Sequence, residues 1–285
     1  TPSMIVVDPA ATAPQPARTL VMGVVNVTPD SFSDGGLWAD PQVAIGHCVD
    51  LLAEGADILD IGGESTRPGT ERTSEADELA RVLPVVRAAV EQGATVSVDT
   101  MRASVARVVV EAGATIVNDV SGGLADPQML PVVAELGCDY VLMHWRGQSV
   151  TMQDLTVYDD VVRDVISETS QQVDAAIAAG IDRERIIVDP GIGFSKTAEQ
   201  NWQLVDAVDA FQEGFDDLRV LWGVSRKRFL GELLADNGED RPALERDAST
   251  TALSTYFALH HAWCVRTHEV RANRDAMETV ARLLG

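Results

Sequence analysis

Short aliphatic runs rich in Val and Ile recur along the chain, and longer stretches of helical periodicity separate them. Runs of this kind are typical of strands in parallel sheets, which helices cover on both faces. The sequence predicts eight such strands, at residues 20–25, 57–61, 95–99, 115–118, 139–143, 185–189, 219–224 and 262–266. Any fold for this chain must therefore place eight strands with helices between them.

The stretch 75–92 is typical of the segments between the strands, because its apolar residues recur with the period of a helix. One stripe contains Leu79, Val82, Leu83, Val86 and Val90. Several of these stretches end in a glycine, which tolerates the left-handed conformation that terminates a helix. These glycines are Gly55, Gly93, Gly113 and Gly180. Eight repeated β/α units favour an α/β fold of the (β/α)8 or TIM-barrel type, although periodicity alone also permits a doubly wound open sheet.

The length of 285 residues is compatible with one barrel domain. Residues 1–19 are rich in Ala, Pro and Thr and are expected to form a flexible tail, with the barrel domain at 20–285. The three cysteines are far apart, and no apolar run reaches the roughly 18 residues that span a bilayer. We therefore expect a cytoplasmic protein without a membrane partner.

The formal net charge is −22, from 44 acidic and 22 basic residues. Such a charge repels nucleic acids and anionic lipids, so neither is an expected partner. Because the overall field repels an anionic ligand, clustered basic residues indicate where such a ligand would bind. The two lysines are Lys196 and Lys227. We give more weight to Lys227, within S-R-K-R, because Lys196 could equally lie on the surface of a first helical turn.

Polar residues follow most of the predicted strands, at the ends where α/β barrels place their active sites. Asp99, Asn118 and Asp189 each come two positions after an inward-pointing residue of the same strand, so each shares the face of that residue. We therefore expect the three side chains to converge on one side of the barrel mouth. Carboxylates and an amide suit the amino-pyrimidinone edge of a flat heterocycle. Each of the three could instead cap the helix that follows. For His144, after the fifth strand, a buried structural role is as plausible as a functional one.

Arg266 and His268 alternate on the last strand and therefore point to the same side, next to Asn26 after the first strand. A guanidinium and an imidazole donate hydrogen bonds to phosphate oxygens, and the Asn26 amide oxygen is a suitable ligand for Mg²⁺. The alternative is that Arg266 and His268 are rim residues that neutralise local carboxylates such as Glu269.

Two polar, glycine-rich segments follow the first two strands and are expected to form mobile loops over the site. They belong to a series of motifs that extends from the first strand to the last: M-G-V-V-N-V-T-P-D-S-F-S-D-G-G (22–36), D-I-G-G-E-S-T-R-P-G (60–69), S-V-D-T (97–100), V-N-D-V-S-G-G (117–123), V-L-M-H (141–144), I-V-D-P-G-I-G-F (187–194), S-R-K-R-F-L-G (225–231) and V-R-T-H-E-V (265–270). By these motifs the chain resembles the dihydropteroate synthases.

The resemblance implies a TIM-barrel transferase of folate biosynthesis, usually a homodimer, which joins 6-hydroxymethyl-7,8-dihydropterin pyrophosphate to 4-aminobenzoate and which sulfonamides inhibit. It implies that the pterin is held by Asp99, Asn118, Met143, Asp189, Phe194 and Lys227. The implied pyrophosphate ligands are Asn26, Arg67, Arg266 and His268, with Asn26 also binding Mg²⁺. The implied 4-aminobenzoate pocket contains Phe32, Thr66, Pro68, Ser225 and Lys227. The implied catalytic residues are Arg67, Asp99 and Lys227.

Two other functions remain open on the sequence. One is a methyltetrahydrofolate-binding methyltransferase domain, another pterin-binding barrel, which would be expected to carry or recruit a corrinoid module. The stretch after the eighth predicted strand is too short for such a module. The other is a catalytically inactive paralogue that binds a pterin without turnover.

Overall fold

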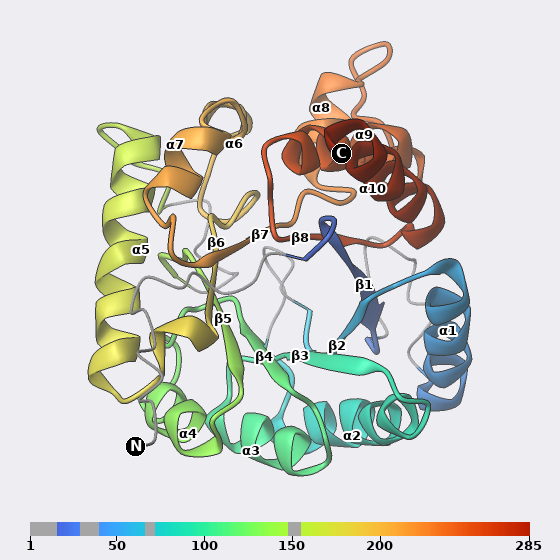
Figure 1. Ribbon diagram of the computed structural model, residues 1–285, viewed down its shortest axis with the longest axis vertical. Coiled ribbons are helices and arrows are strands. Elements are labelled where there is room, and N and C mark those ends of the chain that lie inside the picture. The colour runs from blue at the N-terminus through green and yellow to red at the C-terminus, as the bar shows by residue number, and fades with distance from the viewer. Residues whose placement is uncertain (1–15, 29–39, 66–71, 148–154) are drawn as a thin grey trace, which may run out of the picture.

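The computed structural model describes residues 16–28, 40–65, 72–147 and 155–285. Eight parallel strands form a closed barrel in sequence order, which confirms the predicted (β/α)8 fold and rules out the open sheet (Figure 1). No predicted strand end differs from the observed one by more than two residues. The strands are β1 Leu20–Asn26, β2 Ile58–Gly62, β3 Thr95–Asp99, β4 Ile116–Asp119, β5 Asp139–Met143, β6 Ile186–Asp189, β7 Arg219–Trp222 and β8 Cys264–Thr267.

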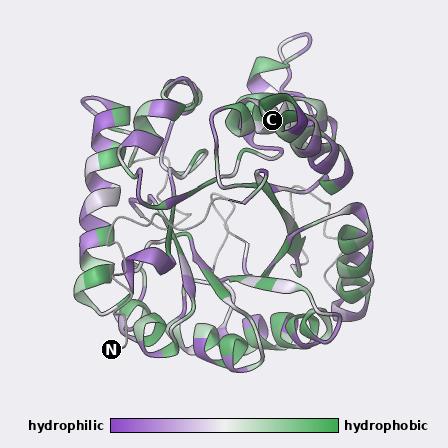
Figure 2. Cartoon of the chain, in the orientation of Figure 1, coloured by the Kyte–Doolittle hydropathy of each residue, from purple (hydrophilic) through white to green (hydrophobic). Residues whose placement is uncertain are grey.

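Helices surround the barrel (Figure 1). They are α1 Pro41–Glu54, α2 Glu75–Glu91, α3 Ala103–Glu111, α4 Met129–Leu136, α5 Val161–Ala178, α6 Ala198–Asp206, α7 Val208–Glu213, α8 Arg228–Leu233, α9 Asp247–Leu259 and α10 Val270–Leu284, with 3₁₀ turns η2 Arg183–Arg185 and η3 Ala243–Glu245. In Figure 2 hydrophobic and hydrophilic residues alternate along most of them, as expected when one side packs on the strands. None of the helices in the described ranges is long and apolar enough to cross a membrane.

The predicted helix ends are confirmed. All four glycines have positive φ angles, for example 101° at Gly55, whose N–H caps α1 by donating to the carbonyls of Leu51 and Leu52. A residue with a Cβ would be strained in this conformation. Each helix can therefore stop abruptly and return the chain to the start of the next strand.

Helix α2 is rotated slightly from the predicted stripe. Val82 and Val86 are fully buried as expected, but Glu78 is buried beside them. Its carboxylate accepts a hydrogen bond of 2.6 Å from Thr100 Oγ1 and pairs with Arg102. The apolar pattern could not reveal this buried acid, because its partners lie after the next strand.

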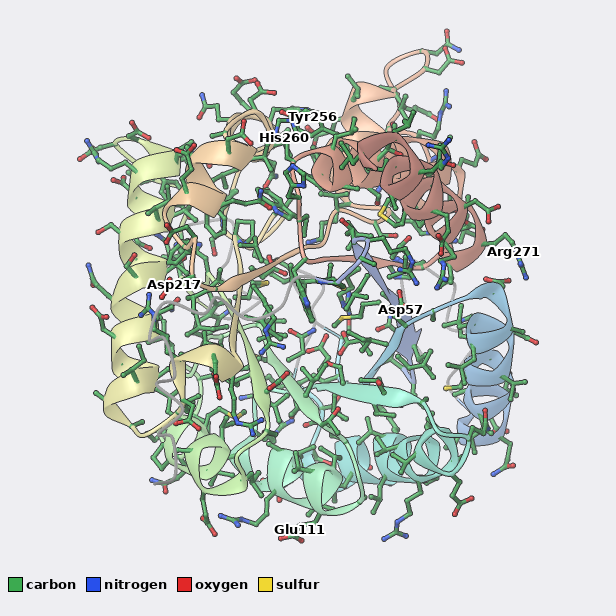
Figure 3. The ribbon with its side chains drawn as sticks, viewed as in Figure 1. Asp57, Glu111, Asp217, Tyr256, His260 and Arg271 are labelled. Carbon is green, nitrogen blue, oxygen red and sulfur yellow. The ribbon has the colours of Figure 1, made fainter. Side chains whose placement is uncertain are left out.

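The inside of the barrel is filled by apolar side chains at its amino-terminal end. This apolar layer consists of Met22, Ile58, Ile116, Val141, Ile187, Leu221, Trp263 and Cys264. A second and larger core lies between the strands and the helices. Figure 3 shows that charged residues such as Glu111 and Arg271 point outward from the ring of helices. The barrel is therefore closed by packing at one end, which leaves the carboxyl ends of the strands for polar groups.

The first residues before β1 belong to the barrel. Thr19 Oγ1 donates a hydrogen bond of 2.7 Å to the carbonyl of Ala262. Arg18 makes a bidentate ion pair with Asp57, with bonds of 2.8 and 2.7 Å, and its side chain is 13% exposed. The barrel thus begins before residue 20, the boundary expected from composition. Residues 1–15 of the expected tail lie outside the described ranges.

We predict that Arg18→Ala destabilises the protein by about 1–2 kcal/mol, because it leaves the half-buried Asp57 carboxylate with weaker partners. The melting temperature should fall by roughly 2–5 °C in a circular-dichroism scan. Arg163→Ala is the matched control, because Arg163 pairs with Asp164 but is 65% exposed. Equal shifts in the two variants would contradict a structural role for the Arg18 pair.

Candidate active site

A polar layer lies directly above the apolar layer inside the barrel. Its side chains occupy the inward positions two residues further along four strands, at Asp60, Asn118, Asp189 and Arg266. Asp99 lies at the carboxyl end of β3, where its Cα pairs with those of Gly62 and Asn118. The closed barrel therefore brings together residues that are more than 200 positions apart in the sequence.

Asp60 is at the centre of this layer, and its side chain has no exposed surface. Its Oδ2 accepts hydrogen bonds from Arg266 Nε at 2.7 Å and from Asn118 Nδ2 at 2.9 Å. Because a carboxylate can only accept, the Asn118 amide must turn its nitrogen toward Asp60. The amide oxygen of Asn118 is thereby oriented as an acceptor for a ligand.

Arg266 lies between two carboxylates. Besides the bond to Asp60, its Nη2 lies 3.4 Å from Oδ2 of Asp99. Arg266 therefore contacts two acids of the polar layer. A role confined to the pyrophosphate, as the resemblance implies, does not account for these contacts.

Asp99 is in an environment that disfavours its charged form. Burial, and after it the nearby Asp60 carboxylate, raise the pKa of its carboxyl to about 8 even though Arg266 partly offsets both effects. A carboxyl group with a pKa near neutrality can respond to the charge of a bound ligand.

Asp189 and Lys227 face the same space on the other side of the barrel. A Cβ placed on Gly223 would lie 3.8 Å from Asp189 Oδ2 and 3.9 Å from Lys227 Nζ. Burial lowers the pKa of Lys227 to about 8 and raises the pKa of Asp189, while the attraction between the two opposes both shifts. Lys227 Nζ also donates to the carbonyl of Ile192 and lies 4.8 Å from the centre of the Phe194 ring.

The residue before Lys227 fixes the turn after β7. Arg226 has a φ of 58°, a strained conformation for a residue with a side chain. Its guanidinium makes a bidentate pair with Asp247, at 2.7 and 2.8 Å. This pair holds the turn and sets the direction in which Lys227 leaves it.

Ser225 holds His268 at two points. Its Oγ accepts from the backbone N–H of His268 at 3.1 Å and lies 2.8 Å from Nδ1 of the ring. Burial and the neighbouring cations lower the pKa of His268 well below its usual value, so the ring is neutral. When the Ser225 hydroxyl donates to Nδ1, the ring proton is on Nε2, which can then donate to an anion.

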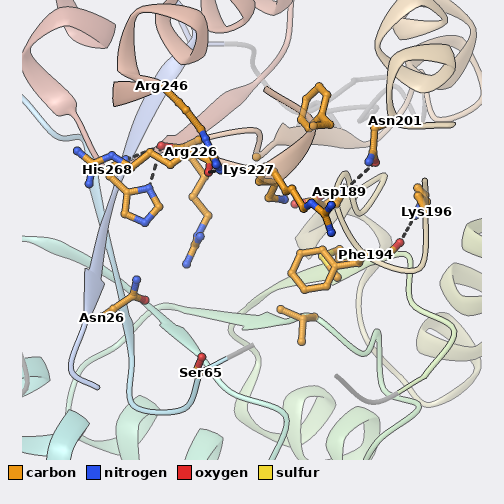
Figure 4. A pocket seen from close by; sticks show the side chains of 18 of the residues that line it. Asn26, Ser65, Asp189, Phe194, Lys196, Asn201, Arg226, Lys227, Arg246 and His268 are labelled. Atoms are coloured by element: carbon orange, nitrogen blue, oxygen red, sulfur yellow. Dashed lines mark hydrogen bonds between the residues drawn. The ribbon is translucent and has the colours of Figure 1, made fainter. Parts of the chain in front are cut away.

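Most of these groups line one cavity of about 1000 Å³ at the carboxyl ends of the strands, with Asp60 beneath Asn118 and Arg266 (Figure 4). The described residues that were proposed from the sequence all line it: Asn26, Asp99, Asn118, Met143, Asp189, Phe194, Ser225, Lys227, Arg266 and His268. The other four, Phe32, Thr66, Arg67 and Pro68, lie outside the described residues.

Two further residues of this region are important although the sequence motifs do not single them out. Asp60 is an acid inside an aliphatic strand, on the face of Ile58, and this is the local signal for it. Lys196, for which the sequence leaves a place on the surface of a first helical turn equally open, is 4% exposed and lines the cavity. A buried lysine is a candidate functional residue, but the sequence around Lys196 does not show that it is buried.

Within the described ranges, no group of three or more His, Cys, Asp or Glu side chains could hold a metal ion. A Mg²⁺ ion that arrives with a pyrophosphate needs fewer protein ligands, because phosphate oxygens and water complete its octahedron. Asn26 lines the cavity and offers one amide oxygen of the required type. The residues present thus fit such an ion.

Residues 22–268 match the model of the pterin-binding enzymes. The dihydropteroate synthase of Mycobacterium leprae is 50% identical over 94% of both chains. Similar solved structures include the Yersinia pestis dihydropteroate synthase with a sulfonamide drug, at 37% identity, a TM-score of 0.88 and coverage of 94% of this chain and 95% of that one. The Xanthomonas albilineans enzyme in complex with 7,8-dihydropteroate has 39% identity, a TM-score of 0.81 and coverage of 94% of both.

The chain belongs to the dihydropteroate synthase family of pterin-binding enzymes. Its second loop motif, at 60–69, is partly outside the described residues, but the ends that flank residues 66–71 are tied together. Glu64 accepts hydrogen bonds from Arg72 Nε at 3.1 Å, from the N–H of Thr73 at 3.2 Å and from Arg102 at 3.0 Å. The described residues on either side of that segment are therefore held together by one carboxylate.

We predict that Asp99→Asn raises the melting temperature by a few degrees at pH 8. The folded state raises the pKa of Asp99, so this group's contribution to stability is full below its unfolded pKa near 3.8 and is lost as the pH rises through the folded value. Asparagine mimics the protonated form and avoids the loss. Thermal melts from pH 4 to 9 should show the gain shrinking at low pH; a gain that grows at low pH would contradict the direction of the shift.

Proposed function

We propose that this chain condenses 6-hydroxymethyl-7,8-dihydropterin pyrophosphate with 4-aminobenzoate, which yields 7,8-dihydropteroate and pyrophosphate in folate biosynthesis. The observation that carries the proposal is a single cavity with buried carboxylates and an amide at its floor and with Arg266, Lys227 and His268 as donors above them. The similar Xanthomonas albilineans enzyme was solved with 7,8-dihydropteroate.

The pterin is assigned to the floor of the cavity. Asp99 and Asp189 accept hydrogen bonds from its amino and ring N–H groups, Asn118 offers its amide oxygen, and Lys227 donates to the ring carbonyl or nitrogen. Met143 and Phe194 form apolar walls against the faces of the ring.

The pyrophosphate is assigned to Arg266 and His268, together with Asn26 and with Arg67 from the loop outside the described residues. The neutral His268 ring donates through Nε2, and the Arg266 guanidinium carries the positive charge. A Mg²⁺ ion on Asn26 would neutralise part of the charge of the leaving group. Arg266 also contacts Asp60 and Asp99, so it links the pterin half of the site to the pyrophosphate half.

The 4-aminobenzoate is assigned to Ser225, Lys227 and the loop residues Phe32, Thr66 and Pro68. Sulfonamides resemble this substrate, and a similar enzyme was solved with one, so we expect them to compete here. Loops that cover this part of the cavity would exclude water from the reaction.

In the proposed reaction, the bond between the exocyclic methylene carbon and the pyrophosphate oxygen breaks, and the electron pair leaves with the oxygen. The positive charge that develops on the pterin favours the ionised form of Asp99, which stabilises that charge, while Arg266 and His268 stabilise the departing anion. The amine of 4-aminobenzoate then forms a bond to the carbon and loses a proton, which the released pyrophosphate or water accepts. The protein contributes orientation and electrostatics and needs no covalent nucleophile.

Homodimer formation and a cytoplasmic location are part of the same proposal. Exposed leucines on and near α8 and α9 favour a protein contact: Leu233, Leu244 and Leu259 are between 44% and 60% exposed. Analytical ultracentrifugation measures the oligomeric state, and cell fractionation measures the location.

The decisive experiment measures pyrophosphate release by purified protein with Mg²⁺. We expect release only when both substrates are present, and we expect sulfonamide inhibition that excess 4-aminobenzoate relieves. No release at saturating substrates, with binding of a pterin intact, would identify an inactive paralogue. Methyl transfer from methyltetrahydrofolate to a corrinoid would support the methyltransferase alternative.

We further predict that Arg266→Ala weakens binding of both the pyrophosphate substrate and a bare pterin, because the side chain orders Asp60 and Asp99 as well as facing the anion. The loss should be roughly tenfold or more for each ligand in calorimetry, the amount lost with one charge-assisted contact. A loss confined to the pyrophosphate substrate would show that the contacts to Asp60 and Asp99 have no role in binding.

A further inference from the structure

The ammonium of Lys196 lies at one edge of the cavity, behind the turn that connects β6 to α6 (Figure 4). Its Nζ donates to the carbonyls of Gly191 at 3.0 Å and Phe194 at 2.9 Å, and it lies 3.0 Å from Nδ1 of His144. An ammonium has three protons, so these three acceptors satisfy it fully.

The protons of this cluster can be assigned. Nε2 of His144 lies 2.8 Å from Oε2 of Glu168, a carboxylate that Arg146 also holds. Burial lowers the pKa of His144 to about 4, so the ring is neutral near pH 7. Since the carboxylate only accepts, the ring proton is on Nε2. Nδ1 must therefore accept from Lys196, and Glu168 on α5 orients Lys196 through the histidine.

The turn that Lys196 holds carries parts of the proposed pterin site. The Ile192 carbonyl in this turn accepts from Lys227 Nζ, and the Phe194 ring lies under the same ammonium. At its start, the N–H of Gly191 donates to Asp189 Oδ1 at 2.7 Å. A shift of the turn would displace the acceptor of Lys227 and the aromatic wall together.

The segment around Lys196 is tightly constrained. Ser195, which lies between the turn and Lys196, has a φ of 51° despite its side chain. A Cβ on Gly191 would clash with the carbonyl oxygen of His144, so the chain passes very close to the end of β5. Strained and tightly packed turns persist when surrounding groups hold them, and Lys196 bonds to both ends of this one.

Lys196 is also costly to bury. It is 4% exposed, and burial lowers its pKa to about 7, with Asp189 partly offsetting the shift. A buried cation destabilises a protein unless its contacts compensate. This cost is consistent with a position at which function, rather than stability, requires the lysine.

We propose that Lys196 is a positioning residue for the pterin half of the site: held by His144 and Glu168, it fixes the Gly191–Phe194 turn and thereby places Phe194 and Lys227. The inference rests on the proposed function for the identity of the ligand. Lys196 acts through the turn and contacts no reacting atom in this assignment.

Lys196→Met removes all three donors and keeps the length of the side chain. We expect the KM for dihydropterin pyrophosphate to rise about tenfold or more, the equivalent of one charge-assisted hydrogen bond. The KM for 4-aminobenzoate at saturating pterin substrate should rise less, by about threefold or less, because of its two described ligands, Ser225 and Lys227, only Lys227 depends on the turn. An unchanged pterin KM, or equal rises in both constants, would overturn the proposal.

A matched pair at His144 tests the chain of hydrogen bonds. His144→Asn keeps an acceptor close to the position of Nδ1, whereas His144→Leu has the same branching without one. Affinity for 6-hydroxymethylpterin in calorimetry should stay within about threefold of wild type for the first and fall about tenfold for the second. Equal affinities would overturn the role of His144, because packing alone would treat the two side chains alike.

The calorimetric readout separates this inference from the proposed function. If the wild-type protein binds the pterin but releases no pyrophosphate, the proposed function fails. The comparison of His144→Asn with His144→Leu still tests whether the turn positions the pterin site. If the wild-type protein turns over and the variants at positions 144 and 196 bind pterin as tightly as it does, the positioning role alone fails.

Discussion

A charged side chain on the inward face of a closed barrel has little water around it, so each one depends on a partner. Asp60 and Arg266 satisfy this condition for each other, and Asn118 and Asp99 are placed around them. Opposite them, Asp189 and Lys227 offset each other's cost of burial. The site is thus a set of buried charges above an apolar layer, in which a neighbour of opposite charge offsets part of the cost of each.

This dependence links binding to protonation. Burial raises the pKa of Asp99 to about 8. It lowers the pKa of Lys196 to about 7 and that of Lys227 to about 8. Groups with such values change charge easily near neutral pH, so a ligand with donors or acceptors in the right places can select one charge state. An enzyme that separates an anion from a cation-like ring needs such an environment.

Much of the fold could be predicted from the sequence because its signals are local. The eight strands, the glycines that end helices and the inward direction of Asn118 and Asp189 all follow from period and backbone preference over a few residues. The surroundings of Glu78, Asp60 and Lys196 could not be predicted in this way. Each is buried and contacts a side chain from another β/α unit, Arg102 for Glu78, Arg266 for Asp60 and His144 for Lys196, so its role depends on which strands become neighbours. The motif resemblance supplied residue roles that geometry alone would not have suggested, but it assigned Arg266 to the anion without the two acids that hold it.

The ion pair between Asp60 and Arg266 has a consequence for how the molecule is made. It joins residues 206 positions apart, across the strand β1 that lies between β2 and β8. During synthesis, the acid emerges long before its partner, and until β8 arrives its strand carries an uncompensated charge on the face that must become interior. Barrels that lack β8 are therefore destabilised by the unpaired acid, and the barrel closes only when β8 has been synthesised.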